Sequence, residues 1–368
     1  MKEKIKYYSL KEILKRDAQY NMIFSPRSNG KTFSVLEYGL KEYVEHGGQM
    51  AIIRRWQEDI RGKRASQVFD SLSNADDGNH ISKITKGEWT DIFYNAGKWY
   101  LAKYENGVRI HSDEPFAFAF ALSNMEHDKS ISYSGVTTIM FDEFLTRGAY
   151  LPDEFVLFMN LISTIVRQRN NVQIFMLANT VNKYCPYFAE MGLNHVKTQK
   201  QGTIDIYTYG NSELTVALEY CGNISETGKP SDKYFAFDNP KLQMITGGAW
   251  ELDIYPHLSV EMKYKPKDIV FKYFIKFDDN ILQCDVVMLP NMCFTYIHQK
   301  TTGIKSIDTD LTFSPEYNPR YNWRRNILKP IDKIGKRVIF FYQHDNVYYQ
   351  NNEIGEIVRN YMNWCKTY

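Results

Sequence analysis

A glycine, a lysine and a hydroxyl residue, Gly30-Lys31-Thr32, follow an apolar run that includes Ile23 and Phe24. The residues between are small or polar, which is typical of a turn between a strand and a helix. In such a turn, backbone N–H groups point inward and the start of the helix adds partial positive charge, so the turn can hold phosphate groups. The lysine would bind the β- and γ-phosphates of ATP, and the hydroxyl would bind the Mg²⁺ that bridges them. The pattern therefore predicts a phosphate loop.

Ser25 stands at the position where this loop pattern usually has glycine. Serine is small enough for the turn, but it would cost free energy there if the backbone needed a positive φ. We expect the nucleotide-binding residues of the loop to be Ser25, Asn29, Gly30, Lys31 and Thr32. The alternative is an ordinary turn before a helix predicted over Phe33 to Tyr43.

A second candidate element is the continuous apolar and β-branched run Val136 to Phe141, which leads directly into Asp142-Glu143. Such a run indicates a Walker B strand buried on both faces, and parallel sheets place their active sites at the carboxyl ends of such strands. Asp142 would hold the hydration shell of Mg²⁺, and Glu143 would orient and deprotonate the attacking water. A buried strand that ends in an acidic turn is the alternative.

Asn179 follows a third predicted strand, Val172 to Leu177. An amide at this strand end could contact the γ-phosphate or the attacking water, so we expect Asn179 to sense the nucleotide. Asparagine at a strand end is also a common turn former, which is the alternative. Three strand-end features in this order favour a nucleotide-hydrolysing site more strongly than any one of them alone.

The composition predicts a soluble globular chain. Its 368 residues are 43% hydrophobic and carry a formal net charge of +2, which fits two domains with sizeable cores. The sequence shows neither a secretory signal pattern nor an apolar run that could span a bilayer, so we expect a cytoplasmic chain without a membrane partner. The five cysteines are scattered and predict neither a disulfide framework nor a zinc site.

Local basic clusters must carry any contact with nucleic acid, because the net charge is small. One cluster begins with Arg54 and Arg55, after a strand predicted over Met50 to Ile53. It continues with the residues that we expect to bind DNA, namely Arg61, Lys63 and Arg64. Arginine and lysine at this edge would contact DNA phosphates without reading the base sequence. A solvated basic helix face is an equally good interpretation.

Further apolar runs predict the remaining elements of a first domain, residues 1–221. In chain order we expect a meander within residues 71–113, a core strand over 116–122, an amphipathic helix over 154–166 and two strands, over 203–209 and 214–220, that complete the sheet. The helix ends at Arg167 and Arg169, where positive charges would complement the helix dipole.

Loop composition separates a second domain from the first. We expect a linker over residues 222–256, with a short helix near 240–245, and a C-terminal domain over residues 257–368. The elements predicted for this α+β domain are strands over 269–277 and 281–289 joined by a turn at Asp278-Asp279-Asn280, strands over 293–298 and 338–342, and a final helix over 352–365.

The order and spacing of these motifs resemble the DNA-packaging ATPases of phi29-type bacteriophages. The resemblance extends from Met22 to about Phe188 and is carried by the arginine-bearing phosphate loop, the Ile-Arg-Arg strand end, Phe141-Asp142-Glu143-Phe144, Arg167-Gln168-Arg169, Leu-Ala-Asn and Pro-Tyr-Phe. It implies an α/β fold whose first domain is a RecA-like ATPase of the ASCE class with a parallel-sheet core.

The resemblance also implies a function and partners. Proteins of this family drive double-stranded DNA into a preformed capsid as a homomeric ring at the viral portal, with ATP and Mg²⁺ as cofactors. We expect a pentameric ring in the host cytoplasm, transiently at the procapsid portal or connector, and a structural RNA as a further candidate partner. By position, Arg167 matches an arginine inserted into a neighbouring subunit's active site, and Lys129 matches a second basic residue acting in trans. Arg27 matches an arginine common in these phosphate loops.

In this family the C-terminal region resembles an RNase H-like nuclease. A two-metal nuclease needs several carboxylates at one spot, whereas Asp278 and Asp279 lie in the predicted hairpin turn. We therefore expect a vestigial domain without nuclease activity, and a terminase with an active nuclease is the alternative. The motifs are also compatible with a RecA-like helicase or partitioning ATPase, and with a catalytically silent scaffold.

Overall fold

The computed structural model describes all residues except 1–6, 27–28, 128–132, 183, 211 and 223–254. The chain divides into two compact units: unit 1 comprises residues 1–146 and 153–250, and unit 2 comprises residues 147–152 and 251–368. Most of the linker predicted over 222–256, with its short helix, lies outside the described residues, so the predicted domain boundaries stay predictions. Within the described part of the chain, no helix is long and apolar enough to cross a membrane.

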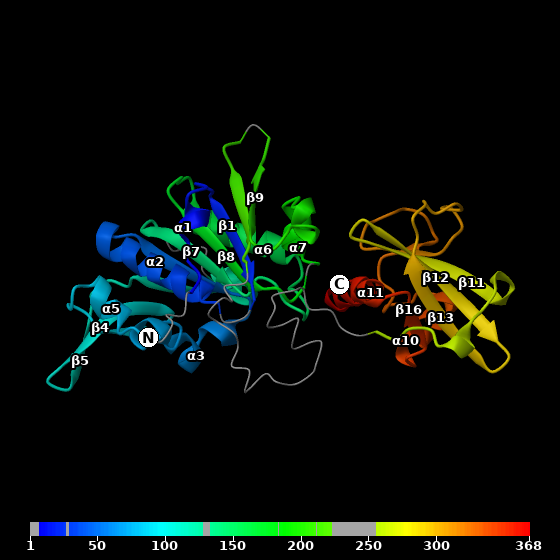
Figure 1. The fold of residues 1–368 in the computed structure, drawn as a ribbon, viewed down its shortest axis with the longest axis horizontal. Helices are drawn as coiled ribbons and strands as arrows, with labels where there is room; N and C mark the ends of the chain where they lie inside the picture. The colour runs from blue at the N-terminus through cyan, green and yellow to red at the C-terminus, as the bar shows by residue number, and fades with distance from the viewer. Residues whose placement is uncertain (1–6, 27–28, 128–132, 183, 211, 223–254) are drawn as a thin grey trace. The chain divides into compact units, whose positions relative to one another are not determined.

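Unit 1 is built around a ten-stranded sheet (Figure 1) with the order β3-β4-β6-β2-β7-β8-β1-β10-β9, in which β5 also pairs with β4. The neighbouring strands β6, β2, β7, β8, β1 and β10 are parallel, whereas the hairpins at both ends of the sheet are antiparallel. The strands are β1 (Tyr20–Ser25), β2 (Gln49–Arg54), β3 (Asp91–Asn95), β4 (Lys98–Glu105), β5 (Val108–His111), β6 (Ala117–Ala121), β7 (Val136–Asp142), β8 (Gln173–Asn179), β9 (Thr203–Thr208) and β10 (Thr215–Tyr220).

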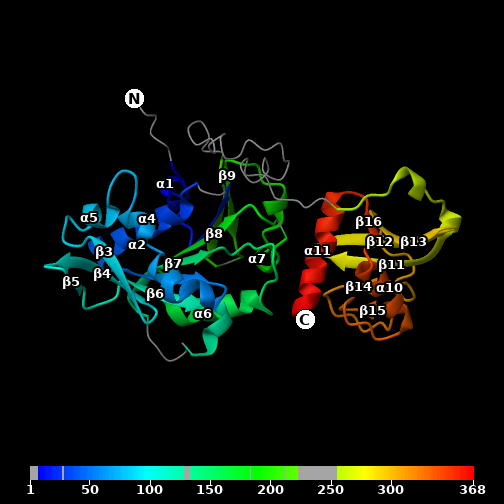
Figure 2. The same ribbon diagram turned by 90° about the horizontal axis from the view of Figure 1, so that it is seen from below.

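Helices cover both faces of this sheet because its parallel strands are apolar on both sides (Figure 2). Ile23 and Met140 join the core that includes apolar residues of α2. Successive residues of a strand point to opposite faces, and Phe141 accordingly stacks on Phe158 of α6. The helical elements of unit 1 are α1 (Lys11–Leu14), α2 (Lys31–His46), α3 (Gly62–Ser66), α4 (Asp70–Ser73), α5 (His80–Ile84), α6 (Glu154–Val166), α7 (Pro186–Glu190) and the 3₁₀ turns η1 (Gln57–Ile60), η2 (Leu122–His127) and η3 (Asn194–Lys197).

Strand β8 lies between β1, which leads into the phosphate loop, and β7, which carries the Walker B carboxylates. In the register of these strands, Ser25 is opposite Asn179, and Asp142 is opposite Leu177. The three predicted strand ends therefore meet at one edge of the sheet. This strand order confirms the predicted RecA-like ASCE class for unit 1.

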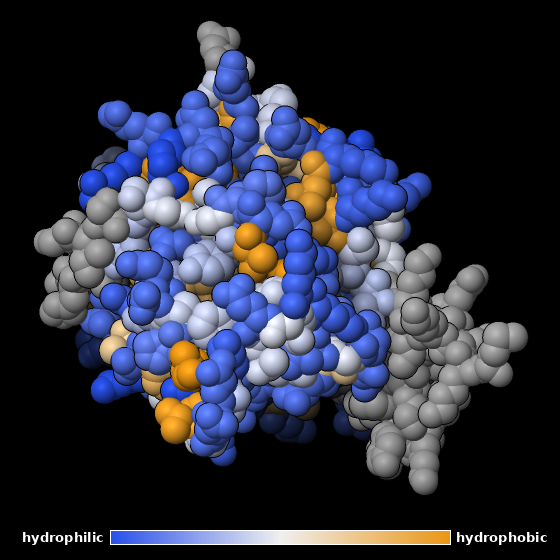
Figure 3. Space-filling view, turned by 90° about the vertical axis from the view of Figure 1, so that its left-hand side faces the viewer, coloured by the Kyte–Doolittle hydropathy of each residue, from blue (hydrophilic) through white to orange (hydrophobic). Residues whose placement is uncertain are grey.

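The other elements predicted for unit 1 are present as well. Strands β3, β4 and β5 form the expected meander, β9 and β10 complete the sheet, and α6 has the predicted bounds. The face of unit 1 in Figure 3 is mainly hydrophilic, and its hydrophobic side chains lie in separate spots rather than in one continuous patch.

Unit 2 contains a six-stranded sheet in the order β15-β14-β11-β12-β13-β16. Strands β11 (Ile269–Phe277), β12 (Asn280–Leu289) and β13 (Met292–Gln299) form an antiparallel meander. On the other side of β11, the short strands β14 (Thr312–Phe313) and β15 (Trp323–Arg324) run parallel to it, which is the strand order of an RNase H-like fold. The remaining elements are β16 (Val347–Tyr349), α10 (Lys333–Gln343), α11 (Asn352–Thr367), η4 (Val260–Met262) and η5 (Pro266–Asp268).

The strand predicted over residues 338–342 is wrong, because these residues belong to helix α10. The run is β-branched and aromatic, which favours a strand locally. Asp332, however, caps the helix by accepting a hydrogen bond from the backbone N–H of Gly335 at 2.7 Å. Gly335, Val338 and Ile339 are buried at helical spacing, so tertiary packing outweighs the local preference.

Residues 147–152 belong to unit 2 although they lie within unit 1 in sequence. Arg147 Nη2 lies 3.2 Å from Glu356 of α11, whose side chain is 1% exposed. The carbonyl oxygen of Arg147 accepts a hydrogen bond from Arg359 at 2.7 Å, and Tyr255 Oη donates to Glu356 at 2.8 Å. Arg359 Nη1 also lies 3.3 Å from Glu356, so three side chains compensate the burial of this carboxylate.

Asp285 is a buried acid in β12 with three side-chain partners. His298 Nε2 lies 3.3 Å from its carboxylate, Tyr264 Oη donates to it at 3.0 Å and Gln283 Nε2 at 2.8 Å. Burial alone would raise the pKa of Asp285, but these hydrogen bonds lower it below its ordinary value. The hydrogen bond between His298 and Asp285 raises the pKa of His298. Both groups are therefore favoured in their charged forms.

We expect the Asp285–His298 pair to make the free energy of unfolding depend on pH. Because the pKa of His298 is raised in the folded state, its contribution is full below the unfolded pKa of about 6.5 and is lost as the pH rises through the folded value. The lowered pKa of Asp285 acts in the opposite sense, since its contribution is full above about pH 3.9 and is lost on acidification.

Urea unfolding of the full chain at pH values below and above the His298 titration would measure this effect. When the pH is raised from the lower to the higher value, the free energy of unfolding should fall less in the His298→Gln variant than in the wild type. An equal loss in both proteins would contradict the role given to the pair.

Candidate functional site

The phosphate-loop residues lie at the carboxyl edge of the sheet, where β1 leads into α2. Gly30 has a φ of +91° and directly precedes α2, a conformation that glycine adopts without strain. Lys31 is buried, and its Nζ donates to Asn179 Oδ1 at 2.7 Å. The side-chain oxygen of Asn29 accepts a hydrogen bond from the Lys31 backbone N–H at 3.1 Å. The loop, the start of α2 and the end of β8 therefore form one site.

Ser25, which stands in place of the first glycine, ends strand β1. It is not among the described residues with a positive φ, so the position does not need the conformational freedom of glycine. The side chain is buried, and its Oγ donates to the carbonyl oxygen of Pro26 at 2.8 Å. Serine is therefore compatible with the backbone of this loop.

The two predicted carboxylates follow β7 directly. Asp142 is buried, and its Oδ2 lies 3.5 Å from Thr32 Oγ1. A hydroxyl and a carboxylate side by side fit the oxygen ligands that Mg²⁺ prefers. Glu143 has a φ of +62°, and its side chain is 65% exposed, so its carboxylate remains accessible at the edge. A left-handed conformation at a residue other than glycine often marks a functional site.

Arg54, the last residue of β2, pairs with both carboxylates. Its Nη2 lies 3.0 Å from Asp142 Oδ2, and its Nη1 lies 3.0 Å from Glu143 Oε2. The planar guanidinium is suited to such two-pronged contacts. The sequence pattern placed Arg54 only in a basic cluster. Arg54 reaches the carboxylates because β2 pairs with β7, and the order of strands in the sheet cannot be read from the local sequence.

Arg55 is buried and anchors the loop after β7. Its Nε and Nη2 bind the two carboxylate oxygens of Glu154, at 2.7 and 2.9 Å. The same guanidinium donates to the carbonyl oxygens of Glu143 at 3.1 Å and Phe144 at 2.8 Å. Tyr187 Oη donates to Glu154 at 2.8 Å, and burial, followed by the charge of Glu154, raises the pKa of Tyr187. The Walker B loop is thus tied to β2 and to the start of α6.

An N-terminal segment that sequence reasoning overlooked lies against the phosphate loop. The Tyr8 backbone N–H donates to the carbonyl oxygen of Asn29 at 2.9 Å, and Tyr8 Oη donates to Glu219 at 2.6 Å. Burial is the main cause that raises the pKa of both Tyr8 and Glu219. A Cβ atom on Gly30 would lie 3.1 Å from Cβ of Tyr7, so close packing as well as φ favours glycine here.

Arg167 does not join this site, because it lies at the opposite edge of the sheet. Helix α6 begins beside the carboxyl end of β7 and extends for 13 residues, about 20 Å. Arg169 marks the far end of the helix by donating to the carbonyl oxygens of Ser134 at 2.9 Å and Val136 at 2.6 Å, at the amino end of β7. Arg167 is exposed there, with a φ of +51°.

The remaining predicted residues fall into two groups. Arg27 and Lys129 lie outside the described residues. Arg61, Lys63 and Arg64 are exposed after the carboxyl end of β2, on the edge that carries the phosphate loop. Within this basic group, Arg64 pairs with Asp59 at 2.6 Å.

The chain matches a known protein family over its N-terminal part. Residues 2–207, more than half of the chain, match the family described as Podovirus DNA encapsidation protein (Gp16). The chain belongs to this family. This membership confirms the resemblance to packaging proteins of phi29-type phages.

Two curated relatives of this encapsidation-family chain match about half of it in sequence. The chain is 28% identical over 184 residues to the DNA packaging protein of Bacillus phage B103, and 27% identical over 189 residues to that of Bacillus phage phi29. These alignments cover 49% and 50% of this chain, and the chain spans about half the length of the curated relatives it matches, 50% of each.

Two solved packaging-motor structures share the fold. The Phi-28 gp11 DNA packaging motor is 19% identical with a TM-score of 0.55, and the match covers 99% of both chains. The bacteriophage Phi-29 viral genome packaging motor assembly is also 19% identical, with a TM-score of 0.54 and 96% of both chains covered. At this level of identity the likeness shows a common fold.

We expect the Arg55→Met variant of this encapsidation-family protein to lose about 3–5 kcal/mol of unfolding free energy, because Glu154 would stay buried without its ion-pair partner. Urea unfolding of the full chain is the measurement. Arg64→Met, which removes an exposed pair with Asp59, is the matched control and should change the value by less than about 1 kcal/mol.

The double variant Arg55→Met, Glu154→Met should recover much of the loss, since it leaves no unpaired buried charge. If the double variant is as unstable as the single one, loss of the ion pair is not the cause.

Proposed function

We propose that this protein is an ATPase that drives double-stranded DNA into a preformed viral capsid. The observation that carries the proposal is the convergence of Lys31, Thr32, Asp142, Glu143 and Asn179 at one edge of the sheet. Phosphate-binding and acidic groups at this edge are what phosphoryl transfer to water requires. The family is one of DNA encapsidation proteins, and the curated relatives are DNA packaging proteins, which connects this chemistry with DNA packaging.

The nucleotide would bind at the start of α2. Backbone N–H groups there and the ammonium of Lys31 would hold the β- and γ-phosphates. Because Asn179 Oδ1 is 2.7 Å from Lys31 Nζ, a γ-phosphate on this lysine would also lie near the amide, which makes Asn179 the proposed sensor. Thr32 and Asp142 would hold Mg²⁺, which when bound neutralises negative charge on the phosphates.

Glu143 is the proposed general base. Its exposed carboxylate stands at the same edge and could accept a proton from the water that attacks the γ-phosphate. Arg54 positions this carboxylate and that of Asp142, with 3.0 Å between its guanidinium nitrogens and each acid. Arg55 holds the backbone of the same loop through the carbonyl oxygens of Glu143 and Phe144.

The active assembly in this proposal is a homomeric ring. Arg167 is exposed at the edge opposite its own phosphate loop, a place from which it would reach a neighbouring subunit's nucleotide rather than its own. An arginine supplied in trans stabilises charge on the γ-phosphate in the transition state. Lys129 is proposed to act in trans as well, and Arg27 to act on its own subunit's nucleotide; a pentamer is the proposed stoichiometry.

The proposed partners are double-stranded DNA and the portal protein, with a structural RNA as a further candidate. Arg61, Lys63 and Arg64 would contact DNA phosphates from the edge that carries the nucleotide. Unit 2 is proposed as a docking and DNA-contact domain, because Asp278 and Asp279 lie in the β11–β12 turn and Asp285 is tied to His298. The protein would work in the host cytoplasm, at the procapsid portal.

We expect Lys31→Ala to abolish ATP binding and turnover, because it removes the charge that neutralises the β- and γ-phosphates. Glu143→Gln should keep ATP bound but lower turnover about 100-fold or more, since an amide preserves the shape yet cannot accept the proton of the water. Nucleotide affinity and phosphate release, measured on both full-length variants, test the two roles separately. Wild-type turnover in Glu143→Gln would exclude Glu143 as the base.

We expect Arg167 to act across a subunit interface. Turnover per subunit should rise with protein concentration as rings assemble, and Arg167→Ala should lower it about 10³-fold. Arg167→Lys is the matched control: it keeps the charge but loses the planar fork, so it should recover only part of the activity.

Mixing the inactive variants tests the trans role directly. Subunits with Arg167→Ala but an intact Lys31 should regain hydrolysis when mixed with Lys31→Ala subunits, because each supplies what the other lacks. A mixture as inactive as its components would leave Arg167 as a charge at the end of a helix.

A further inference from the structure

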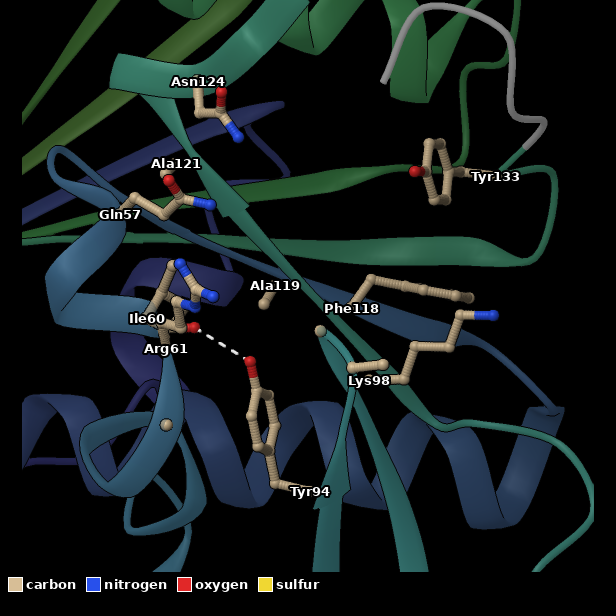
Figure 4. A pocket seen from close by; sticks show the side chains of 13 residues that line it. Gln57, Ile60, Arg61, Tyr94, Lys98, Phe118, Ala119, Ala121, Asn124 and Tyr133 are labelled. Atoms are coloured by element: carbon tan, nitrogen blue, oxygen red, sulfur yellow. Dashed lines mark hydrogen bonds between the residues drawn. The ribbon is translucent and has the colours of Figure 1, made fainter. Parts of the chain in front are cut away.

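A second pocket in unit 1, of about 640 Å³, lies away from the phosphate loop (Figure 4). It lies along β6, and it is bounded by η1 on one side and by the β3–β4 turn on the other. The polar, charged and aromatic residues that line it include Gln57, Arg61, Lys98, Phe118, Asn124 and Tyr133. None of them belongs to the proposed ATP site.

The hollow exists because β6 is only partly covered on the side away from β2. Strand β4 pairs with β6 at two positions, Lys98 with Phe118 and Trp99 with Ala117, and the hairpin then turns away. The last backbone contact is the hydrogen bond from Ala119 N to the carbonyl oxygen of Gly97, at 2.8 Å. From this contact onward, the side chains of Ala119 and Ala121 contribute only methyl groups to the lining, so the space stays open.

The pocket carries positive charge without an acid in its lining. Arg61 and Lys98 are both exposed, and among the described residues neither side chain has a hydrogen-bond or ion-pair partner. They lie on either side of Tyr94 in Figure 4, and Tyr94 Oη donates to the carbonyl oxygen of Ile60 at 3.2 Å. An anion bound here would therefore meet cationic donors without displacing an existing salt bridge.

Aromatic and amide groups complete the lining. Tyr133 packs edge-on against Phe118, with 5.3 Å between ring centroids, so these rings form an ordered wall. The amides of Gln57 and Asn124 line the same pocket from η1 and η2. Cations suit a phosphate, rings suit a stacked base, and amides can hydrogen-bond the edge of a base.

We propose that this pocket binds a nucleoside phosphate, with the phosphate toward Arg61 and Lys98 and the base toward Phe118 and Tyr133. The volume is within the range of sites that hold ligands of this size. The chemistry is the same whether the ligand is a free nucleotide or one residue of a nucleic-acid strand. The site is separate from the phosphate loop, so it does not depend on the proposed ATP hydrolysis.

The test uses the full-length chain with Lys31→Ala, in which the phosphate loop no longer contributes to nucleotide binding. Fluorescence anisotropy with a labelled single-stranded oligothymidylate, and competition by AMP, measure binding to the second pocket. In this background, Lys98→Ala should weaken binding about tenfold, because an exposed cation on the phosphate is lost. Ala119→Leu should weaken binding to a similar extent by filling the hollow without changing any charge.

Lys86→Ala is the matched control, since Lys86 is an exposed lysine that neither lines the pocket nor belongs to the proposed DNA-binding group. It should change binding by less than about twofold. Competition by AMP would identify a free nucleotide as a ligand, and binding of the oligonucleotide alone would identify a strand; either result supports the pocket.

Three results would overturn the proposal: no binding of either probe, an unchanged affinity in Lys98→Ala, or a loss in Lys86→Ala as large as that in Lys98→Ala. The last would mean that a diffuse basic surface binds the probe. Urea midpoints of the variants show whether each one is folded. Because every protein in the test lacks the phosphate-loop lysine, a failure here leaves the ATPase proposal untouched, and the converse also holds.

Discussion

The buried ion pair between Arg55 and Glu154 is the constraint on which the carboxyl edge of the sheet in unit 1 depends. Two charges removed from water are stable only when their hydrogen bonds are satisfied. Here Glu154 accepts from Arg55 and Tyr187, and Arg55 also satisfies two carbonyl oxygens of the loop after β7. Because side chains alternate along a strand, fixing Arg55 on one side of β2 directs Arg54 to the other side, toward the two carboxylates.

The residues at and just after the carboxyl end of β2 consequently contribute to two separate sites. Arg54 contacts the acids of the proposed ATP site, and η1, which begins at Gln57, lines the second pocket. A rigid parallel strand joins them, since β2 pairs with both β6 and β7 along its length. The proposed ATP site and the β6 pocket are therefore connected through one strand of the same sheet.

Local pattern was most reliable where it was long and uninterrupted. The runs that became β1, β7 and β8 were recognisable because strands covered on both faces are apolar throughout, and the polar residue that ends each of them marked the site. Short runs were less informative. Val338 to Tyr342 has strand-like residues but forms part of α10, because a cap at Asp332 and helical spacing of its buried residues decided the outcome.

The sequence by itself determined which residues could do the chemistry: the lysine and hydroxyl of the phosphate loop, the acids after β7 and the amide after β8. Residue type and position at a strand end carry that information, since both are local. Only the tertiary structure decided what holds them. Strand order places β8 between β1 and β7 and β2 beside β7, and so brings Asn179 to Lys31 and Arg54 to the acids. The Tyr8 contact with the phosphate loop and the Arg55–Glu154 pair join residues far apart in the chain, and no local pattern encodes such pairings.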